Sequence, residues 1–259
     1  MSNRKNYTIL IKEHYKKEAE EHGLASTSTM ADLMTRRLEI VNISSYLKDE
    51  EKCLEVGCGN GSGSIEILKT KKIDLTCIDF SRDLITLAQK QSTKNIKGKI
   101  KFQERDILKL QDKNKYDCVF TERCIINLLN WNDQKKALKN IAGVLKKGGR
   151  LILLEAFKDG LDSLNKAREE IGLAAIPPAY HNLLLDKISV SKYLVSQGMR
   201  FVEENNFLSS HYFGSRILYP ALAKAVSKEI IYNSTFADFF ASLPPHGNFA
   251  HIKILIFKK

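Results

Sequence analysis

Short apolar runs alternate along the chain with longer stretches in which apolar residues recur at helical spacing. The short runs predict strands at 53–56, 73–79, 99–105, 116–120, 150–155, 201–208 and 249–257. The longer stretches predict helices at 7–22, 30–47, around 65–68, 82–93, 131–145 and 186–197, and one that begins near residue 159. Strands that alternate with helices in this way are typical of an α/β fold.

Two of the predicted helices precede the first strand. The first ends at Gly23, a residue type favoured just after a helix, and the second has candidate N-cap residues at 26–29. We therefore expect an N-terminal helical cap at 1–48 and a main domain at 49–259.

Composition favours one large domain with an apolar core, because 43% of the 259 residues are hydrophobic. No apolar run reaches the roughly 18 residues that a membrane span needs, and the basic N-terminal stretch does not resemble a signal peptide. We therefore expect a cytoplasmic protein with no membrane segment. The cysteines lack the paired spacing of zinc sites, so we expect no metal and buried free thiols at Cys53, Cys58, Cys77, Cys118 and Cys124.

The net charge of +11 raises the question of an anionic partner such as nucleic acid, a membrane surface or an acidic small substrate. The charge is spread along the chain, and the densest runs, at 69–72 and 94–101, have no aromatic residues interleaved for stacking on bases. A solvated surface rich in lysine is the favoured interpretation, and nucleic-acid binding is not.

A glycine-rich turn follows the first predicted strand. Glycine lets the backbone turn sharply and lets a ligand approach without meeting a Cβ atom. The spacing fits no dinucleotide fingerprint, because Ser62 and Ser64 stand where a third glycine or an alanine is required. A ligand site and a plain connection between strand and helix both remain open at this point.

Glu55, followed by Gly57, Gly59 and Gly61, resembles motif I of the class I methyltransferases, which use S-adenosyl-L-methionine (SAM). SAM carries an ammonium and a sulfonium but no phosphate, so a nearby carboxylate suits it. The Leu-Lys-Lys-Gly-Gly run at 145–149, between a helix and an apolar strand, is a second similarity. The resemblance implies a Rossmann-like, seven-stranded, mostly parallel sheet with helices on both faces, N-terminal helices and an insertion before the last strand. It also implies SAM as cofactor and S-adenosyl-L-homocysteine (SAH) as product.

Acids at the ends of successive predicted strands extend the resemblance. Asp79 follows the glycine turn by about twenty residues, the spacing at which a carboxylate holds ribose hydroxyls. An ordinary aspartate at a helix N-cap is the alternative. By resemblance, Phe80 packs on adenine and Asp106 accepts from its amine. The expected cofactor residues are Glu55, Gly57, Cys58, Gly59, Gly61, Asp79, Phe80, Asp106, Ile107 and Thr121.

Catalytic candidates lie after the fourth strand and in a proline-held turn. The segment after residue 120 lacks the Asp/Asn-Pro-Pro-aromatic motif of enzymes that methylate amino groups of bases. His181 is the favoured base, because histidine titrates near working pH and Pro177-Pro178 can fix its turn. The expected catalytic residues are His181, Glu122 and Arg123, and the rival bases are Glu122, Glu155, His14 and His211.

Two additions to the core, at 159–185 and 209–248, are expected on the substrate side. Both ends of the second one should emerge on the cofactor face, because the sixth strand is parallel and the last antiparallel in this fold. An interaction or dimerisation surface is the alternative for that segment. The expected substrate-binding residues are Tyr15, Arg36, Glu155, Tyr180, Asn182, His211, Tyr212 and Arg216.

Three segments, at 29–32, 122–131 and 180–182, resemble those of methyltransferases encoded with bacterial capsule and surface-polysaccharide genes. That resemblance implies methyl transfer to a hydroxyl oxygen of a small sugar, nucleotide-linked sugar or phosphoramidate. An RNA methyltransferase and a non-catalytic SAM-binding partner protein are the rival hypotheses. The sequence identifies neither the acceptor nor the oligomeric state.

Overall fold

The computed structural model describes residues 2–25, 31–231 and 233–259. Its centre is a seven-stranded sheet with strand order β3-β2-β1-β4-β5-β7-β6, in which β7 alone runs antiparallel to its neighbours. The strands are β1 (Lys52–Val56), β2 (Asp74–Asp79), β3 (Lys99–Glu104), β4 (Tyr116–Glu122), β5 (Leu145–Ala156), β6 (Arg200–Asn205) and β7 (Ile252–Lys258). The predicted Rossmann-like architecture is confirmed.

The burial of each strand follows its place in the sheet. The central strands β1 and β4 are buried along almost their whole length, as their continuous apolar sequences predict. The edge strands β3 and β6 keep many exposed polar side chains, which discourages pairing with another chain. The place of a strand in the sheet therefore explains why the central strands are almost uniformly apolar while the edge strands also contain polar residues.

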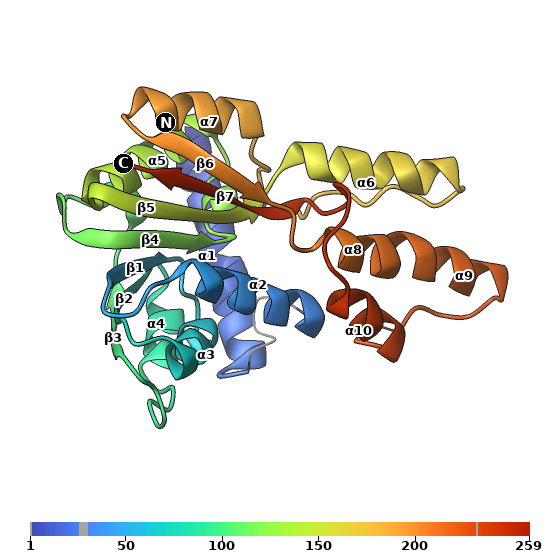
Figure 1. The fold of residues 1–259 in the computed structure, drawn as a ribbon, viewed down its shortest axis with the longest axis horizontal. Coiled ribbons are helices and arrows are strands. Elements are labelled where there is room, and N and C mark those ends of the chain that lie inside the picture. The colour runs from blue at the N-terminus through green and yellow to red at the C-terminus, as the bar shows by residue number, and fades with distance from the viewer. Residues whose placement is uncertain (1, 26–30, 232) are drawn as a thin grey trace.

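Helices cover both faces of the sheet (Figure 1). The helices α2 (Leu33–Tyr46) and α3 (Ser62–Thr70) pack together on one face, and α5 (Trp131–Val144) and α7 (Lys187–Ser196) on the other. The short helix α4 (Arg82–Ala88) contacts β2 and β3. Among the described residues, no helix is both long and apolar enough to cross a membrane.

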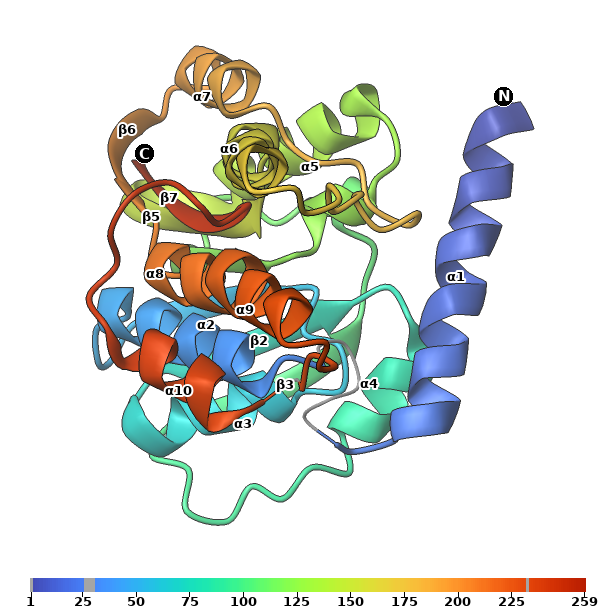
Figure 2. The same ribbon diagram turned by 90° about the vertical axis from the view of Figure 1, so that its right-hand side faces the viewer.

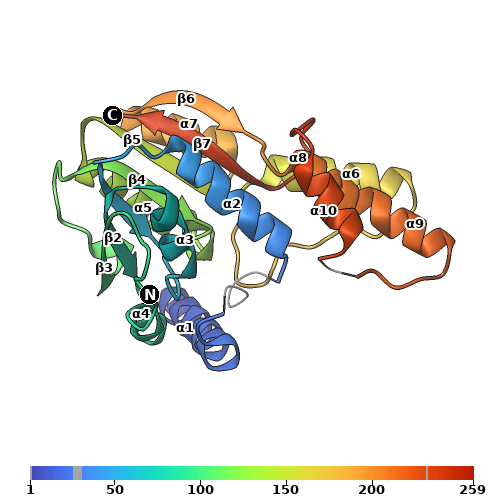
Figure 3. The ribbon, with the colours of Figure 1, turned by 60° about the horizontal axis from the view of Figure 1, so that its bottom comes forward.

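The carboxyl edge of the parallel strands is covered in two halves (Figure 2). The helix α1 (Ser2–His22) stands beside α4 over one half. Over the other half project α6 (Lys158–Glu170), α8 (Ser209–Tyr212), a π-helix (Phe213–Leu218), α9 (Tyr219–Ala225) and α10 (Thr235–Ser242). We call this second group the edge extension, and Figure 3 shows it beyond the end of the sheet.

Three sequence-based expectations need correction. The N-cap of α2 is Asp32, whose carboxylate accepts from the Thr35 N–H, and the expected candidates at 26–29 lie outside the described residues. The fifth strand begins at Leu145 instead of 150, because the run after it already pairs with neighbouring strands. The helix expected at 82–93 ends at Ala88.

A buried lysine anchors the edge extension to the sheet. Lys253 on β7 is fully buried, and its ammonium donates to Asp159 at 2.8 Å, to Glu204 at 2.9 Å and to Asn248 at 2.8 Å. A buried charge is tolerated only when it is paired and hydrogen-bonded. These bonds join β6, β7 and the first turn of α6.

Gly160 is required where α6 crosses the chain before β7. A Cβ atom at this position would lie 2.1 Å from the carbonyl oxygen of Ala250. We expect Gly160→Ala to lower the free energy of unfolding by about 1–3 kcal/mol, because backbone must move to remove the clash. Gly143, within α5, has nothing within 4 Å of such a Cβ. Gly143→Ala is the matched control and should raise stability by about 0.5–1 kcal/mol. Urea unfolding of both variants tests the pair, and equal stabilities would contradict it.

Candidate functional site

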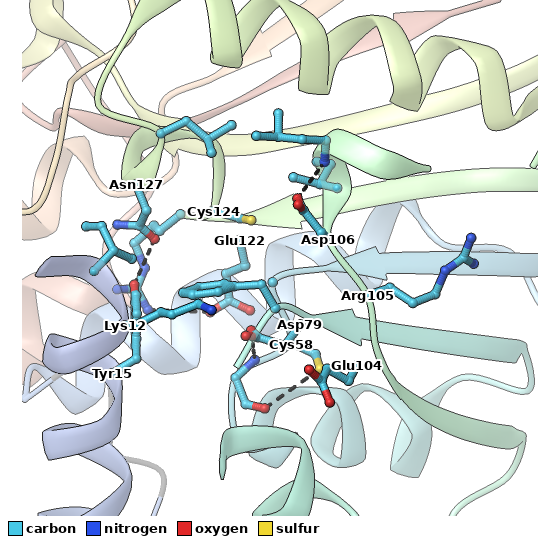
Figure 4. Close-up of a pocket in the computed structure, with 18 of the residues that line it drawn as sticks. Lys12, Tyr15, Cys58, Asp79, Glu104, Arg105, Asp106, Glu122, Cys124 and Asn127 are labelled. Atoms are coloured by element: carbon cyan, nitrogen blue, oxygen red, sulfur yellow. Dashed lines mark hydrogen bonds and ion pairs between the residues drawn. The ribbon is translucent and has the colours of Figure 1, made fainter. Parts of the chain in front are cut away.

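A cavity of about 510 Å³ lies at the carboxyl ends of β1, β2, β3 and β4. Figure 4 shows acidic, basic and aromatic side chains converging on it from these strand ends and from α1. Its wall consists of Tyr7, Ile11, Lys12, Tyr15, Arg36, Gly57, Cys58, Gly59, Asn60, Asp79, Phe80, Glu104, Arg105, Asp106, Ile107, Leu108, Lys109, Glu122, Arg123, Cys124, Asn127 and Leu128.

The glycine turn after β1 forms one side of this cavity. Gly57, Gly59 and Gly61 all have left-handed backbone angles, with φ of 83°, 55° and 76°. Gly57 also has no room for a side chain, because a Cβ atom there would lie 2.5 Å from the Cβ of Cys124. The loops after β1 and β4 therefore touch, and only glycine permits that approach.

Asp79, at the end of β2, is bonded to the glycine turn. One carboxylate oxygen accepts from the Gly59 N–H at 3.0 Å and the other from the Ser81 N–H at 2.9 Å. Burial raises the pKa of Asp79 against the opposing effect of these N–H groups. Each carboxylate oxygen keeps a lone pair for a ligand hydroxyl, as the sequence-based assignment requires.

Asp106 and Phe80 complete the half of the cavity next to β3. Asp106 caps a 3-10 helix (Ile107–Lys109) by accepting from the Leu108 N–H at 2.8 Å. Its carboxylate and that of Asp79 both face the cavity in Figure 4. The Phe80 ring lies edge-on to Tyr15 of α1, with centroids 6.1 Å apart. An aromatic face, two acids and the glycine turn thus surround one space.

On the opposite wall Arg36, Glu122 and Arg123 form a charged cluster with Glu39, a buried residue that is not part of the wall. Arg36 bonds Glu122, and Arg123 pairs with Glu39 at 2.9 Å. Arg36 lies against Gly63, where a Cβ atom would be 2.5 Å from its guanidinium. Arg123 adopts a left-handed φ of 52°, which is unfavourable for a non-glycine residue. The strained backbone directs this guanidinium back to Glu39 instead of out to solvent.

Helix α1 closes the cavity from the solvent side. Its Tyr7 hydroxyl bonds Asp133, and its Tyr15 hydroxyl donates to Asn127 at 2.7 Å. Between these two contacts Lys12 extends into the cavity (Figure 4). At the far end, the Asn60 side chain donates to the Gly23 and Ala25 carbonyls, at 2.9 Å each. The helix is thus attached to the core at both of its ends.

His181 lies behind Asn127 and not on the cavity wall. Its ring stacks on His14 of α1 with centroids 4.0 Å apart, and Asn127 donates to the Asn182 side chain at 2.8 Å. Tyr180 is exposed and bonds His14 at 3.1 Å. Burial, followed by the nearby His14 and Arg123, lowers the pKa of His181 to about 4. The imidazole is therefore neutral at pH 7.

Two acids expected at the site lie beneath the cavity. Glu55 is buried and accepts from the Ser64 hydroxyl at 2.5 Å, so it supports the turn from inside. Glu155 is fully buried and accepts N–H groups of Cys124 and Ile125 at 3.1 and 3.0 Å. Neither carboxylate is part of the wall.

The expected substrate residues of the edge extension form a separate polar cluster. His211 and Arg216 both bond Asp32, at 3.2 and 2.5 Å. The Tyr212 ring lies beneath the Arg216 guanidinium at 5.3 Å and beside His251 at 5.5 Å. This cluster joins the edge extension to the start of α2.

The cavity wall contains about half of the predicted site residues. Those on it are Tyr15, Arg36, Gly57, Cys58, Gly59, Asp79, Phe80, Asp106, Ile107, Glu122 and Arg123. Those away from it are Glu55, Gly61, Thr121, Glu155, Tyr180, His181, Asn182, His211, Tyr212 and Arg216.

The sequence analysis missed Lys12, Asn60 and Asn127 on this wall. Asn60 and Asn127 stand within segments that were already singled out, so their polarity was a usable signal. Nothing distinguished Lys12 from the other lysines of α1.

Comparison with known proteins agrees with this geometry. Residues 53–149, from β1 into β5, match the family model described as a methyltransferase domain. Within these residues the chain is similar to a methyltransferase domain, a class of domain whose cofactor is SAM.

The chain also resembles curated methyltransferases. Similar sequences include the O-methyltransferase rstn1 of Aspergillus nomiae, at 32% identity over 42% of this chain and 48% of that protein. An O-methyltransferase of Pyrenophora dematioidea is 33% identical over 41% of this chain and 39% of that protein. The chain thus spans half or less of the length of these curated relatives.

A solved structure with the same fold is the magnesium protoporphyrin IX methyltransferase of Synechocystis with bound SAH. It aligns with a TM-score of 0.57 over 99% of this chain and 97% of its own, at 15% identity. This likeness concerns the methyltransferase fold and not the substrate.

Cys53, Cys58, Cys77 and Cys118 are buried free thiols, as predicted. Cys124 is also a free thiol, but it is only partly buried, so the prediction was wrong on its burial. Within residues 2–25, 31–231 and 233–259, no group of three or more His, Cys, Asp or Glu side chains is placed to hold a metal ion.

The lowered pKa of His181 predicts a pH dependence of stability. Between pH 6.5 and about 4 the unfolded chain binds a proton at this histidine more readily than the folded chain, so stability falls as pH falls through that range. We expect His181→Gln to lose less stability than the wild type between pH 7 and pH 5. Urea unfolding at both pH values measures the difference, and parallel losses would contradict the assignment. Burial also lowers the pKa of His251 to about 4. This histidine is present in both proteins, so it does not contribute to the difference between them.

Proposed function

We propose that the protein is a SAM-dependent O-methyltransferase that acts on a small molecule. The observation that carries this proposal is the convergence of the glycine turn, Asp79, Phe80 and Asp106 on a single cavity. Bound SAM supplies a methyl group on a sulfonium, which is already a good leaving group. The protein then has to bind, orient and exclude water, and a base has to take the proton of the acceptor oxygen.

The residues of the cavity fit SAM. Asp79 would hold the ribose hydroxyls, and Phe80 with Asp106 would hold the adenine. Gly57 and Gly59 leave their backbone open to the methionine end. Since Glu55 lies beneath the turn, we assign the charged groups of the methionine to the wall that contains Arg36 and Glu122.

Oxygen is the proposed acceptor atom. The two curated relatives described above are named O-methyltransferases, although the match covers only part of each. The segment after β4 also lacks the motif of amino-group methylation in bases. For the acceptor molecule we propose a phosphorylated or nucleotide-linked sugar, or a phosphoramidate. The support is the sequence resemblance and the basic composition.

The edge extension is the proposed acceptor side of the site. It projects from the same edge of the sheet as the cavity, and its helix α10 contacts α2, which carries Arg36 of the cavity wall. In this proposal Arg216, His211 and Tyr212 shape the outer part of the acceptor site through their contacts with Asp32. Transfer from labelled SAM to a panel of nucleotide-sugars is the direct search for the acceptor.

Asp79 provides the main test of cofactor binding. Asp79→Ala removes an acceptor for two ribose hydroxyls and should weaken SAH binding by one to two orders of magnitude, about 1.5–3 kcal/mol. The matched control is Asp74→Ala at the exposed start of the same strand, which should bind SAH as the wild type does. Calorimetric titration with SAH measures both variants. Unchanged affinity in Asp79→Ala would remove this residue from the cofactor site.

His181 is the proposed base. Its neutral imidazole can accept a proton, and Asn127 of the cavity wall donates to the His181 carbonyl at 3.4 Å. His181→Ala should reduce kcat on the acceptor at least about tenfold and leave SAH affinity unchanged, because a base acts in the transition state. If the variant keeps most of its turnover, His181 is not the base, and a residue of the wall such as Glu122 becomes the candidate.

A further inference from the structure

Glu155 is a buried acid that the proposed mechanism does not use. It lies near the end of β5 with none of its surface exposed. Its carboxylate accepts the N–H groups of Cys124, Ile125 and Ile126 at 3.1, 3.0 and 3.3 Å. These bonds hold the loop that places Cys124 on the cavity wall and against Gly57.

No described cation forms an ion pair with Glu155. Lys253, its partner across the β5–β7 pairing, is bound to Asp159 and Glu204. Arg123, near the end of β4, pairs with Glu39. The titratable groups that interact with Glu155 are the hydroxyl of Tyr15 and the thiol of Cys124. Burial raises the pKa of both, and the charges of Asp79 and Glu155 raise it further.

The hydrogen bonds to Glu155 do not fully replace water. They favour the ionised carboxylate, but burial outweighs them and raises the pKa of Glu155 to about 7. A carboxyl group in this state ionises readily when a cation arrives nearby, because opposite charges favour each other's charged forms. The cavity above it is the place where a cationic ligand would arrive.

We propose that Glu155 is the counter-charge for the sulfonium of bound SAM and that it gives the site a preference for SAM over SAH. This inference rests on the proposed function. The two ligands differ at the sulfur, which is a cation in SAM and a neutral thioether in SAH. The loop held by Glu155 touches the glycine turn, where the methionine end of either ligand is assigned. When Glu155 is ionised, its negative charge beneath that point attracts the cation and leaves the neutral thioether unaffected.

The direction of the pH dependence follows from this charge. Below pH 7 Glu155 is protonated in the ligand-free protein, so binding SAM must displace a proton. SAM affinity therefore rises from pH 6 to pH 8, while the part of SAH affinity that depends on Glu155 stays constant. When methyl transfer has made the sulfur neutral, the attraction ends and the product is held less tightly.

The experiment measures the ratio of the SAH to the SAM dissociation constant by calorimetry at pH 6.0 and pH 8.0. In the wild type this ratio should rise by about threefold to tenfold, the size expected for a partly screened charge pair. In Glu155→Gln the ratio at pH 8.0 should be lower than in the wild type. The ratio should also change less between pH 6.0 and pH 8.0 than it does in the wild type. Any titration of the ligands themselves is common to both proteins. His14→Gln, which removes a histidine of α1 and keeps Glu155, should preserve the rise.

Proton release gives a second measurement that needs no variant. Titrations at pH 6.5 in buffers of different ionisation enthalpy should show that SAM releases more protons than SAH on binding to the wild type. This comparison decides the matter if Glu155→Gln does not fold.

Three outcomes overturn the inference. They are a ratio that is constant with pH in the wild type, equal proton release for both ligands, and a rise that is undiminished in Glu155→Gln. In each of these cases both ligands still bind, and the proposed function stands. Failure of both SAM and SAH to bind would instead overturn the proposed function.

Discussion

The pairing of β1 with β2 on one side and with β4 on the other places three loops at one point. Val56 is in register with Ile78 and with Thr121, so the glycine turn, Asp79 and the loop after β4 all begin at the same height in the sheet. The bond from Gly59 to Asp79 and the contact of Gly57 with Cys124 then join these loops to each other. The cavity is the space that remains above these contacts, and α1 covers it.

The fold and the convergence of Asp79, Phe80 and Asp106 on one cavity were predictable because they depend on local sequence. A buried strand followed by glycines, and acids at strand ends, are patterns within a few residues of each other. Parallel strands then bring Asp79 and Asp106 together without further information. The same reasoning did not predict that Glu55 and Glu155 lie away from the cavity wall, because the side-chain direction in a strand depends on what packs over it. Glu155 accepts N–H groups of the loop after β4 from inside, and Glu55 accepts from Ser64 in the first turn of α3.

The contacts between distant segments were not predictable. His14 and His181 lie far apart in the sequence, as do Arg36 and Glu122, and no spacing rule connects them. Their pairing depends on how α1 and α2 dock on the sheet, which is a property of packing and not of any single segment. The capping of α2 by Asp32 was missed for a similar reason, since His211 and Arg216 bind the same carboxylate and help to select that position.

The attachment of α1 at both ends has a consequence for the rate at which ligands exchange. The helix crosses the cavity between the Tyr7 contact with Asp133 and the Asn60 contacts with Gly23 and Ala25. The Tyr15 bond to Asn127 also holds the helix to the cavity wall between these two ends. A ligand that enters or leaves on this side has to displace the helix, and such motions take microseconds to milliseconds. The bonds of one helix therefore set how fast a ligand exchanges on this side of the cavity, independently of how well it fits inside.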